Sequence, residues 1–183
     1  MLTQTQWTFD TDDLSAFEFA TTKKTPAGKW VVRDGALVQT DRNATDGRFA
    51  MAILKESSYK DLTLSVRAKP VEGEVDRAAG LVWRYRDSDN YYVARSNALE
   101  KNVRLYRVVV GKRIQFAGKE NVELKSGEWH TLKIAHKGAE IAVFLDGEKL
   151  FEAKDETFAE AGKIGVWIKS DSLTWFDNLK VEP

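Results

Sequence analysis

The chain has 183 residues, of which 43% are hydrophobic and 31% charged, and its 28 basic and 28 acidic side chains give a formal net charge of zero. This composition excludes an intrinsically disordered chain, and the zero net charge excludes the basic surface with which proteins usually bind nucleic acid. No segment reaches the apolar length needed to span a bilayer, so we expect no membrane insertion. The six Trp, five Tyr and nine Phe residues are unusual, because aromatic side chains suit both β-strands and stacking on sugar rings.

Cysteine is absent from the chain, which excludes disulfides, thiolate metal sites and cysteine nucleophiles. The first ten residues, MLTQTQWTFD, contain neither the charged region nor the apolar region of a signal peptide. The localisation therefore stays open between two readings. Either the protein is cytoplasmic, or Met1 replaces a removed signal peptide and the protein is extracytoplasmic, in the periplasm or secreted.

Strand-like segments with period-two alternation follow one another along the chain, and hardly any segment has a helical period. Asp-Gly pairs at 34–35, 46–47 and 146–147 mark tight turns between them. The predicted strands are residues 29–33, 36–40, 48–54, 61–69, 78–86, 90–97, 103–110, 113–117, 129–137, 140–146, 163–169 and 172–181. Residues 155–161 are the one predicted helical turn late in the chain. This pattern predicts an all-β, two-sheet antiparallel β-sandwich, with residues 1–183 in a single domain.

Four segments carry a resemblance to a known superfamily. Residues 127–147 contain Gly-x-Trp-His-x-Leu-x-Ile and then Val-x-Leu-Asp-Gly, which resembles a hairpin of laminin-G-like, concanavalin A-type jelly rolls. Residues 162–181, with Gly-x-x-Gly-x-Trp before Phe-Asp-Asn-Leu, resemble the closing strand pair of that superfamily. Residues 30–38 and 80–95 are similar to bacterial 3-keto-disaccharide hydrolase-like domains. The resemblance implies a concanavalin A-like jelly roll, a fold shared by lectins, glycan-binding modules, hydrolases and lyases.

Alternation within the strands predicts which side chains leave the core. Along 163–171 the aliphatic residues take one side, so Trp167, Lys169 and Asp171 share the other. Along 103–110 the same pattern directs Arg104 and Tyr106 outward. An aromatic ring beside charged groups can stack on a sugar and bind its hydroxyls, which predicts a sugar-binding surface. Ordinary aromatic cover on a half-exposed sheet is the alternative.

Residues 95–104 form the densest polar segment, in which Arg and Asn side chains suit sugar hydroxyls and Glu100 suits an acid or base. A solvated loop with Asn in its turns is the alternative. The predicted substrate-binding residues are Trp83, Arg95, Asn97, Asn102, Arg104, Tyr106, Trp167 and Lys169. Glu100 and Asp171 are the predicted catalytic residues, should the protein be an enzyme.

Whether the protein is an enzyme stays open. Glycoside hydrolysis normally needs two carboxylates, and the family 16 hydrolases of this fold carry them in a Glu-x-Asp-x-x-Glu-like strand that this sequence lacks. The segment 72–76 has acidic residues in the wrong order within a predicted loop. We expect its carboxylates, Glu72, Glu74 and Asp76, to be solvated or ion-paired beside Arg77 and to take no part in catalysis.

No cofactor is predicted, and the residues alone indicate no metal site. His130 and His136 fall on the core side of one predicted strand, so we expect both to be packed residues. The superfamily resemblance implies a structural calcium between the first and last strands, for which Asp177 with Asp10 or Asp12 could supply oxygen ligands.

Three functions therefore remain. The first is a carbohydrate-binding or carbohydrate-processing domain that uses one concave aromatic and polar sheet face, with a glycan or oligosaccharide as partner. The second is a glycosidase-like hydrolase acting on a (3-keto-)disaccharide or another glycan, which needs two carboxylates beside the aromatic surface. The third is a laminin-G-like protein-binding module, which needs a flat apolar patch. The sequence does not determine the oligomeric state.

Overall fold

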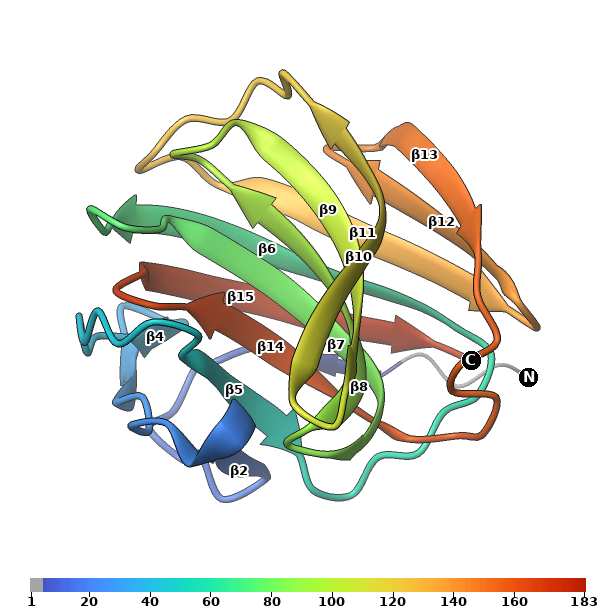
Figure 1. Cartoon of the computed structure of the whole chain (residues 1–183). Coiled ribbons are helices and arrows are strands. Elements are labelled where there is room, and N and C mark those ends of the chain that lie inside the picture. The colour runs from blue at the N-terminus through green and yellow to red at the C-terminus, as the bar shows by residue number, and fades with distance from the viewer. Residues whose placement is uncertain (1–4) are drawn as a thin grey trace.

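The computed structural model describes residues 5–183 as two antiparallel β-sheets packed face to face (Figure 1). The eight-stranded sheet has the order β13-β12-β11-β6-β15-β4-β3, and β1 pairs with β15. Its strands are β1 (Thr5–Trp7), β3 (Trp30–Arg33), β4 (Ala36–Gln39), β6 (Leu62–Glu72), β11 (His130–Lys137), β12 (Glu140–Leu145), β13 (Glu148–Lys154) and β15 (Leu173–Glu182).

The seven-stranded sheet has the order β10-β9-β8-β7-β14-β5-β2. Its strands are β2 (Phe17–Thr21), β5 (Phe49–Leu54), β7 (Ala78–Asp87), β8 (Asn90–Asn97), β9 (Asn102–Val109), β10 (Lys112–Glu120) and β14 (Lys163–Lys169). The predicted two-sheet antiparallel sandwich is therefore confirmed, and every described strand pair is antiparallel.

The helical turn expected at 155–161 is wrong. This segment is a loop, and the Asp155 carboxylate explains why: it accepts the backbone N–H of Thr157 and also binds Tyr92 and Arg107, which ties the chain down in an irregular turn. The helical element within residues 5–183 is a 3-10 turn at Thr22–Lys24. No helix in that range is long and apolar enough to cross a membrane.

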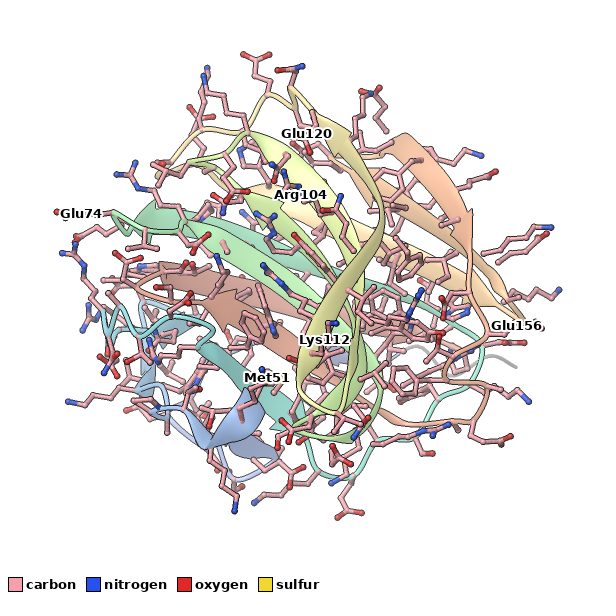
Figure 2. The ribbon with its side chains drawn as sticks, in the orientation of Figure 1. Met51, Glu74, Arg104, Lys112, Glu120 and Glu156 are labelled. Carbon is pink, nitrogen blue, oxygen red and sulfur yellow. The ribbon has the colours of Figure 1, made fainter. Side chains whose placement is uncertain are left out.

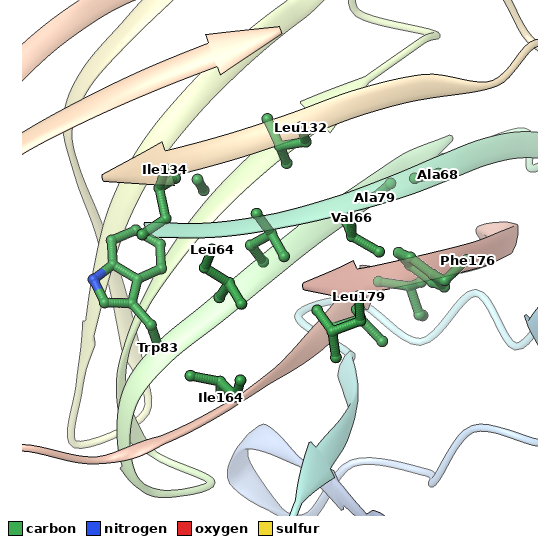
Figure 3. Close-up of a cluster of buried hydrophobic side chains, with 14 of the residues drawn as sticks. Leu64, Val66, Ala68, Ala79, Trp83, Leu132, Ile134, Ile164, Phe176 and Leu179 are labelled. Atoms are coloured by element: carbon green, nitrogen blue, oxygen red, sulfur yellow. The ribbon is translucent and has the colours of Figure 1, made fainter. Parts of the chain in front are cut away.

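The core between the sheets consists of the inward set of each alternating strand (Figure 3). In β6 the buried residues Leu62, Leu64, Val66 and Ala68 alternate with partly exposed ones. Apolar residues of β14, in the opposite sheet, and of β15, the neighbouring strand, pack against them, among them Ile164, Phe176 and Leu179. Burial of this apolar surface is the main stabilisation that the sandwich has.

Trp83 lies in this core, which corrects its prediction as a substrate-binding residue. It is 0% exposed and stacks on Tyr92 with ring centroids 5.6 Å apart. Its indole Nε1 donates a hydrogen bond to Nδ1 of His136 over 2.9 Å. Burial lowers the pKa of His136 to about 4, so this imidazole is neutral and accepts the indole proton.

The buried imidazole makes stability depend on pH. The folded pKa of His136, about 4, lies below its ordinary value of 6.5, so the unfolded chain takes up a proton first as the pH falls, and stability drops between pH 6.5 and pH 4. As the pH falls from 6.5 to 4, we expect the unfolding free energy of His136→Gln to decrease by about 2 kcal/mol less than that of the parent. Denaturant unfolding from pH 7 to pH 4 measures the difference.

His130→Gln is the matched control, because His130 lies at the other end of β11 and its side chain binds Asp146, which follows β12, instead of packing against Trp83. It should keep the parent's loss of stability. If the unfolding free energies of the parent and His136→Gln changed equally with pH, the claim that the buried His136 imidazole is neutral would be wrong.

Candidate functional site

The outer face of the seven-stranded sheet, which points away from the other sheet, gathers most of the predicted binding residues. Residues directly opposite each other in adjacent strands share a face. The paired positions across β9, β8, β7 and β14 are Asn102 with Asn97, Arg104 with Arg95, Tyr106 with Val93, Arg95 with Gly80, and Gly80 with Trp167. Lys169 lies two residues beyond Trp167 on the same face. The strands thus bring together seven of the eight predicted binding residues, all except Trp83.

The polar cluster at one end of this face consists of Arg95, Glu100, Asn102, Arg104 and Glu120. Arg95 donates from Nη1 and Nη2 to Glu100 Oε2 over 3.1 and 3.2 Å. Asn102 Nδ2 donates to Oε2 of both Glu100 and Glu120, over 3.2 and 3.1 Å. Arg104 Nε donates to Glu120 Oε1 over 3.1 Å, and Figure 2 shows this pair side by side.

Both carboxylates of the cluster are held in the charged form. Burial by itself disfavours the charge on Glu100, but the adjacent Arg95 and the hydrogen bonds from Asn102 and Arg95 outweigh it and lower the pKa of this carboxyl. The hydrogen bond from Arg104 is the largest cause that lowers the pKa of Glu120. The cluster can therefore offer sugar hydroxyls both strong acceptors and strong donors.

Asp76, in the loop between β6 and β7, lies beside the predicted binding residues Lys169 and Asn97. It is ion-paired, as expected for the loop acids, but it is 0% exposed and lies on the candidate face. Lys169 Nζ lies 2.8 Å from Asp76 Oδ2, and Asn97 Nδ2 donates to Asp76 Oδ1 over 2.8 Å. Glu72 behaves as expected, since it is an exposed residue paired with Arg42.

Asp171 does not fit the predicted catalytic role. Its carboxylate accepts the backbone N–H groups of Glu74, Val75 and Asp76 over 2.6, 3.2 and 3.0 Å. These bonds lower the pKa of Asp171 although burial acts in the opposite direction. Because both oxygens are occupied by the backbone, Asp171 shapes the 73–77 loop and thereby positions Asp76.

The aromatic cluster occupies the rest of the face and is covered, contrary to the exposed sugar-stacking surface that the sequence predicts. Trp167 is 0% and Tyr106 3% exposed. Gly80 leaves room for the indole, because a Cβ there would lie 3.1 Å from Trp167 Cβ and Cε3. Trp167 Nε1 donates to the Tyr91 hydroxyl over 3.2 Å. Loss of this side chain would therefore cost stability, so Trp167 is no dispensable surface residue.

Arg113, from β10, contributes to this cover. Its guanidinium carbon lies 4.3 Å from the Tyr106 ring centroid, 4.9 Å from that of Phe49 and 6.0 Å from that of Trp167. Such distances are typical of cation–π contacts. Sequence reasoning missed Arg113 and Glu120 because β10 carries charged and polar residues on both faces and so has no clear phase.

The implied calcium site does not fit the residues present. Asp177 Oδ1 accepts the backbone N–H of Asn178, and its Oδ2 faces Arg67 at 3.9 Å. Asp10 binds the Thr8 hydroxyl. Within residues 5–183 no group of three or more His, Cys, Asp or Glu side chains is placed to hold a metal ion.

Two surface hollows in the described part of the chain lie on the other sheet. One of about 380 Å³ is lined by β11, β12 and β13, and one of about 410 Å³ lies beside it near β6 and the end of β15. The ion pair at the first, Lys154 with Glu140, is 76% and 73% exposed. Such hydrated ion pairs contribute little to stability or binding and are common on protein surfaces. The buried, converging polar groups make the seven-stranded sheet the better candidate.

The structural role of Asp171 is testable by replacing it with Asn. An amide retains one acceptor oxygen but turns an NH2 group toward the backbone donors of the loop, so we expect Asp171→Asn to lower the unfolding free energy by about 1–3 kcal/mol. Amide hydrogen exchange at residues 74–76 should accelerate. Glu74→Gln, at an exposed neighbouring position, is the control and should change neither quantity; an unaltered Asp171→Asn protein would show that these bonds do not order the loop.

Comparison with known proteins identifies the family of the chain and supports its fold. Residues 4–182 match the family described as the 3-keto-alpha-glucoside-1,2-lyase-like domain. The carbohydrate-binding module CBM66 from Bacillus subtilis has a similar structure, with a TM-score of 0.73 and 21% identity over 90% of this chain and 95% of that chain. A search of curated protein sequences finds no match.

Two glucan-related structures are also similar. A LamA variant from Z. galactanivorans, in complex with laminaritriose and laminaritetraose, gives a TM-score of 0.70 at 11% identity, covering 100% of this chain and 98% of that chain. A prokaryotic β-1,3-1,4-glucanase (lichenase) from a mouse hindgut metagenome gives 0.70 at 15% identity, covering 98% of each. At such identities the likeness establishes the concanavalin A-like jelly-roll fold.

Proposed function

The chain belongs to the 3-keto-alpha-glucoside-1,2-lyase-like domain family, a carbohydrate-active jelly-roll family, and from this premise we propose that it is a carbohydrate-binding domain. The glycan would lie on the outer face of the seven-stranded sheet, where the polar cluster supplies the hydrogen bonds. Part of that cluster is open to solvent: the side chains of Arg104, Glu100 and Glu120 are 29%, 38% and 56% exposed.

The observation that carries the proposal is a set of buried polar atoms without a hydrogen-bond partner in the protein. Buried polar groups are nearly always hydrogen-bonded, so exceptions point to a missing partner. Besides Asp76 Oδ2, which faces Lys169 Nζ at 2.8 Å, three of these atoms lie on the candidate face: Arg95 Nε, Asn102 Oδ1 and Arg113 Nη1. Two are donors and one is an acceptor, and a sugar hydroxyl can serve either kind.

Binding is favoured over hydrolysis by the state of the carboxylates. A general acid needs a raised pKa so that it carries a proton near neutral pH. The pKa values of Glu100 and Glu120 are both lowered instead. A hydrolase acting on a (3-keto-)disaccharide or another glycan remains the second candidate, because Glu100 and Glu120 share the Asn102 amide and so form a carboxylate pair. Glycan cleavage by the parent that is lost in Glu100→Gln would favour it.

A laminin-G-like protein-binding role has less support. It needs a contiguous exposed apolar patch. The large hydrophobic residues exposed within residues 5–183 are scattered over strands and loops: Phe19, Val31, Val75, Leu99 and Val110.

Arg104→Ala tests the binding proposal. Loss of this partly exposed guanidinium removes a charged donor from the site, so we expect weaker glycan binding by about 1–3 kcal/mol, or roughly 5- to 150-fold. Calorimetric titration of an oligosaccharide panel that includes laminaritriose and mixed-linkage glucan fragments measures it.

Arg42→Ala is the matched control, since Arg42 also forms an exposed ion pair, with Glu72, but outside the polar cluster. It should bind like the parent. Equal affinities for Arg104→Ala and the parent, with a glycan that the parent binds, would remove the polar cluster from the site.

A further inference from the structure

Arg113 is a charged side chain whose hydrogen-bonding capacity the protein leaves unused. Its guanidinium lies over the rings of Tyr106, Phe49 and Trp167. A cation–π contact uses none of the five N–H donors of a guanidinium, which stay available for an acceptor. Within residues 5–183 no protein acceptor takes any of these donors, no carboxylate lies within 4.0 Å, and Nη1 is fully buried.

Two other buried arginines, Arg48 and Arg84, are fully bound by the protein, and Arg95 lacks a partner only at Nε. Arg48 donates to the carbonyls of Pro26 and Ser170 and to the Asp41 carboxylate, among others. Arg84 is bound in the same manner, to three backbone carbonyls and the Asp61 carboxylate. Since the same chain partners its buried guanidinium groups elsewhere, the unpartnered one points to an external acceptor.

The surroundings of Arg113 favour an anion as that acceptor. Burial lowers the pKa of Arg113, and the nearby positive charge of Arg95 acts in the same direction, whereas Tyr106 and Asp76 act against them and do not reverse the shift. The neighbouring charges are already paired with each other and not with Arg113, because Glu100 pairs with Arg95 and Lys169 pairs with Asp76. A bound anion would offset this uncompensated charge, whereas a neutral hydroxyl would not.

We propose that Arg113 binds the anionic group of an acidic glycan, either a uronic acid carboxylate or a sulfate ester. The inference rests on the proposed function and specifies its ligand. A guanidinium fork matches both anions with two parallel hydrogen bonds. The aromatic rings beneath hold its plane in place, so little side-chain freedom is lost on binding.

The polar cluster adds a second requirement, because Glu100 and Glu120 would repel a further anion. The Tyr106 hydroxyl, beneath Arg113, accepts a hydrogen bond from Arg95 Nη2 over 2.8 Å, so the polar cluster adjoins the Arg113 site. The acidic group of the ligand is therefore placed at Arg113, and its neutral hydroxyls over the polar cluster.

Glucuronic acid-substituted xylotriose and its carboxyl-reduced form are a matched pair of probes, and a sulfated galacto-oligosaccharide and its desulfated form are a second pair. We expect the parent to bind the acidic member of at least one pair 10-fold or more tightly than the neutral member, with the preference shrinking as salt is added. The pair that shows the preference identifies the anion.

Two substitutions locate the effect. Arg113→Met keeps a long side chain on the rings but removes the charge, so it should abolish the preference, while Arg113→Lys should retain part of it. Lys112→Met, at the exposed neighbouring position labelled in Figure 2, is the control and should keep the preference. Thermal unfolding provides a readout independent of binding: Arg113→Met should unfold at the parent temperature or higher, because a buried unpaired charge is costly.

The outcomes separate the two proposals. Equal binding of both members of each pair, or a preference that survives Arg113→Met, overturns the role of Arg113 and leaves the glycan-binding domain intact. Failure of every acidic and neutral glycan to bind overturns the proposed function and this inference with it.

Discussion

The central strands of the seven-stranded sheet are buried on both faces, and the remaining features of the candidate site depend on this constraint. In β5, β7, β8 and β14 nearly every residue is buried, whereas β6 of the other sheet alternates between buried and partly exposed positions. One face of these strands is covered by the opposite sheet. The other face has no such partner, so it is covered by its own aromatic and charged side chains and by Arg113 from β10.

Charged groups in such a setting need partners, because removing a charge from water is expensive. The molecule meets this need by long-range pairing. Lys169 at the end of β14 neutralises Asp76 from the 73–77 loop, and Asp171 holds that loop through three backbone N–H groups. The same rule explains why buried polar atoms without partners are informative: they indicate where a ligand would contribute hydrogen bonds.

Much of the fold could be predicted from the sequence, because alternation and Asp-Gly turns are local signals. The shared face of Arg104, Tyr106, Trp167 and Lys169 follows from the same alternation. Trp83 could not be placed, since β7 is apolar on both faces and offers no phase. The cover over Trp167 and the burial of Asp76 depend on residues distant in the chain, so no local pattern revealed them.

The most direct test of the central claim is where a bound glycan perturbs the protein. Backbone amide shifts from NMR, recorded during titration with an oligosaccharide that binds, report this without any substitution. Shifts concentrated in β8, β9 and β10 and in the 73–77 loop are the result expected for binding on the outer face of the seven-stranded sheet. Shifts concentrated in β11, β12 and β13, which line a surface hollow of about 380 Å³, would contradict it.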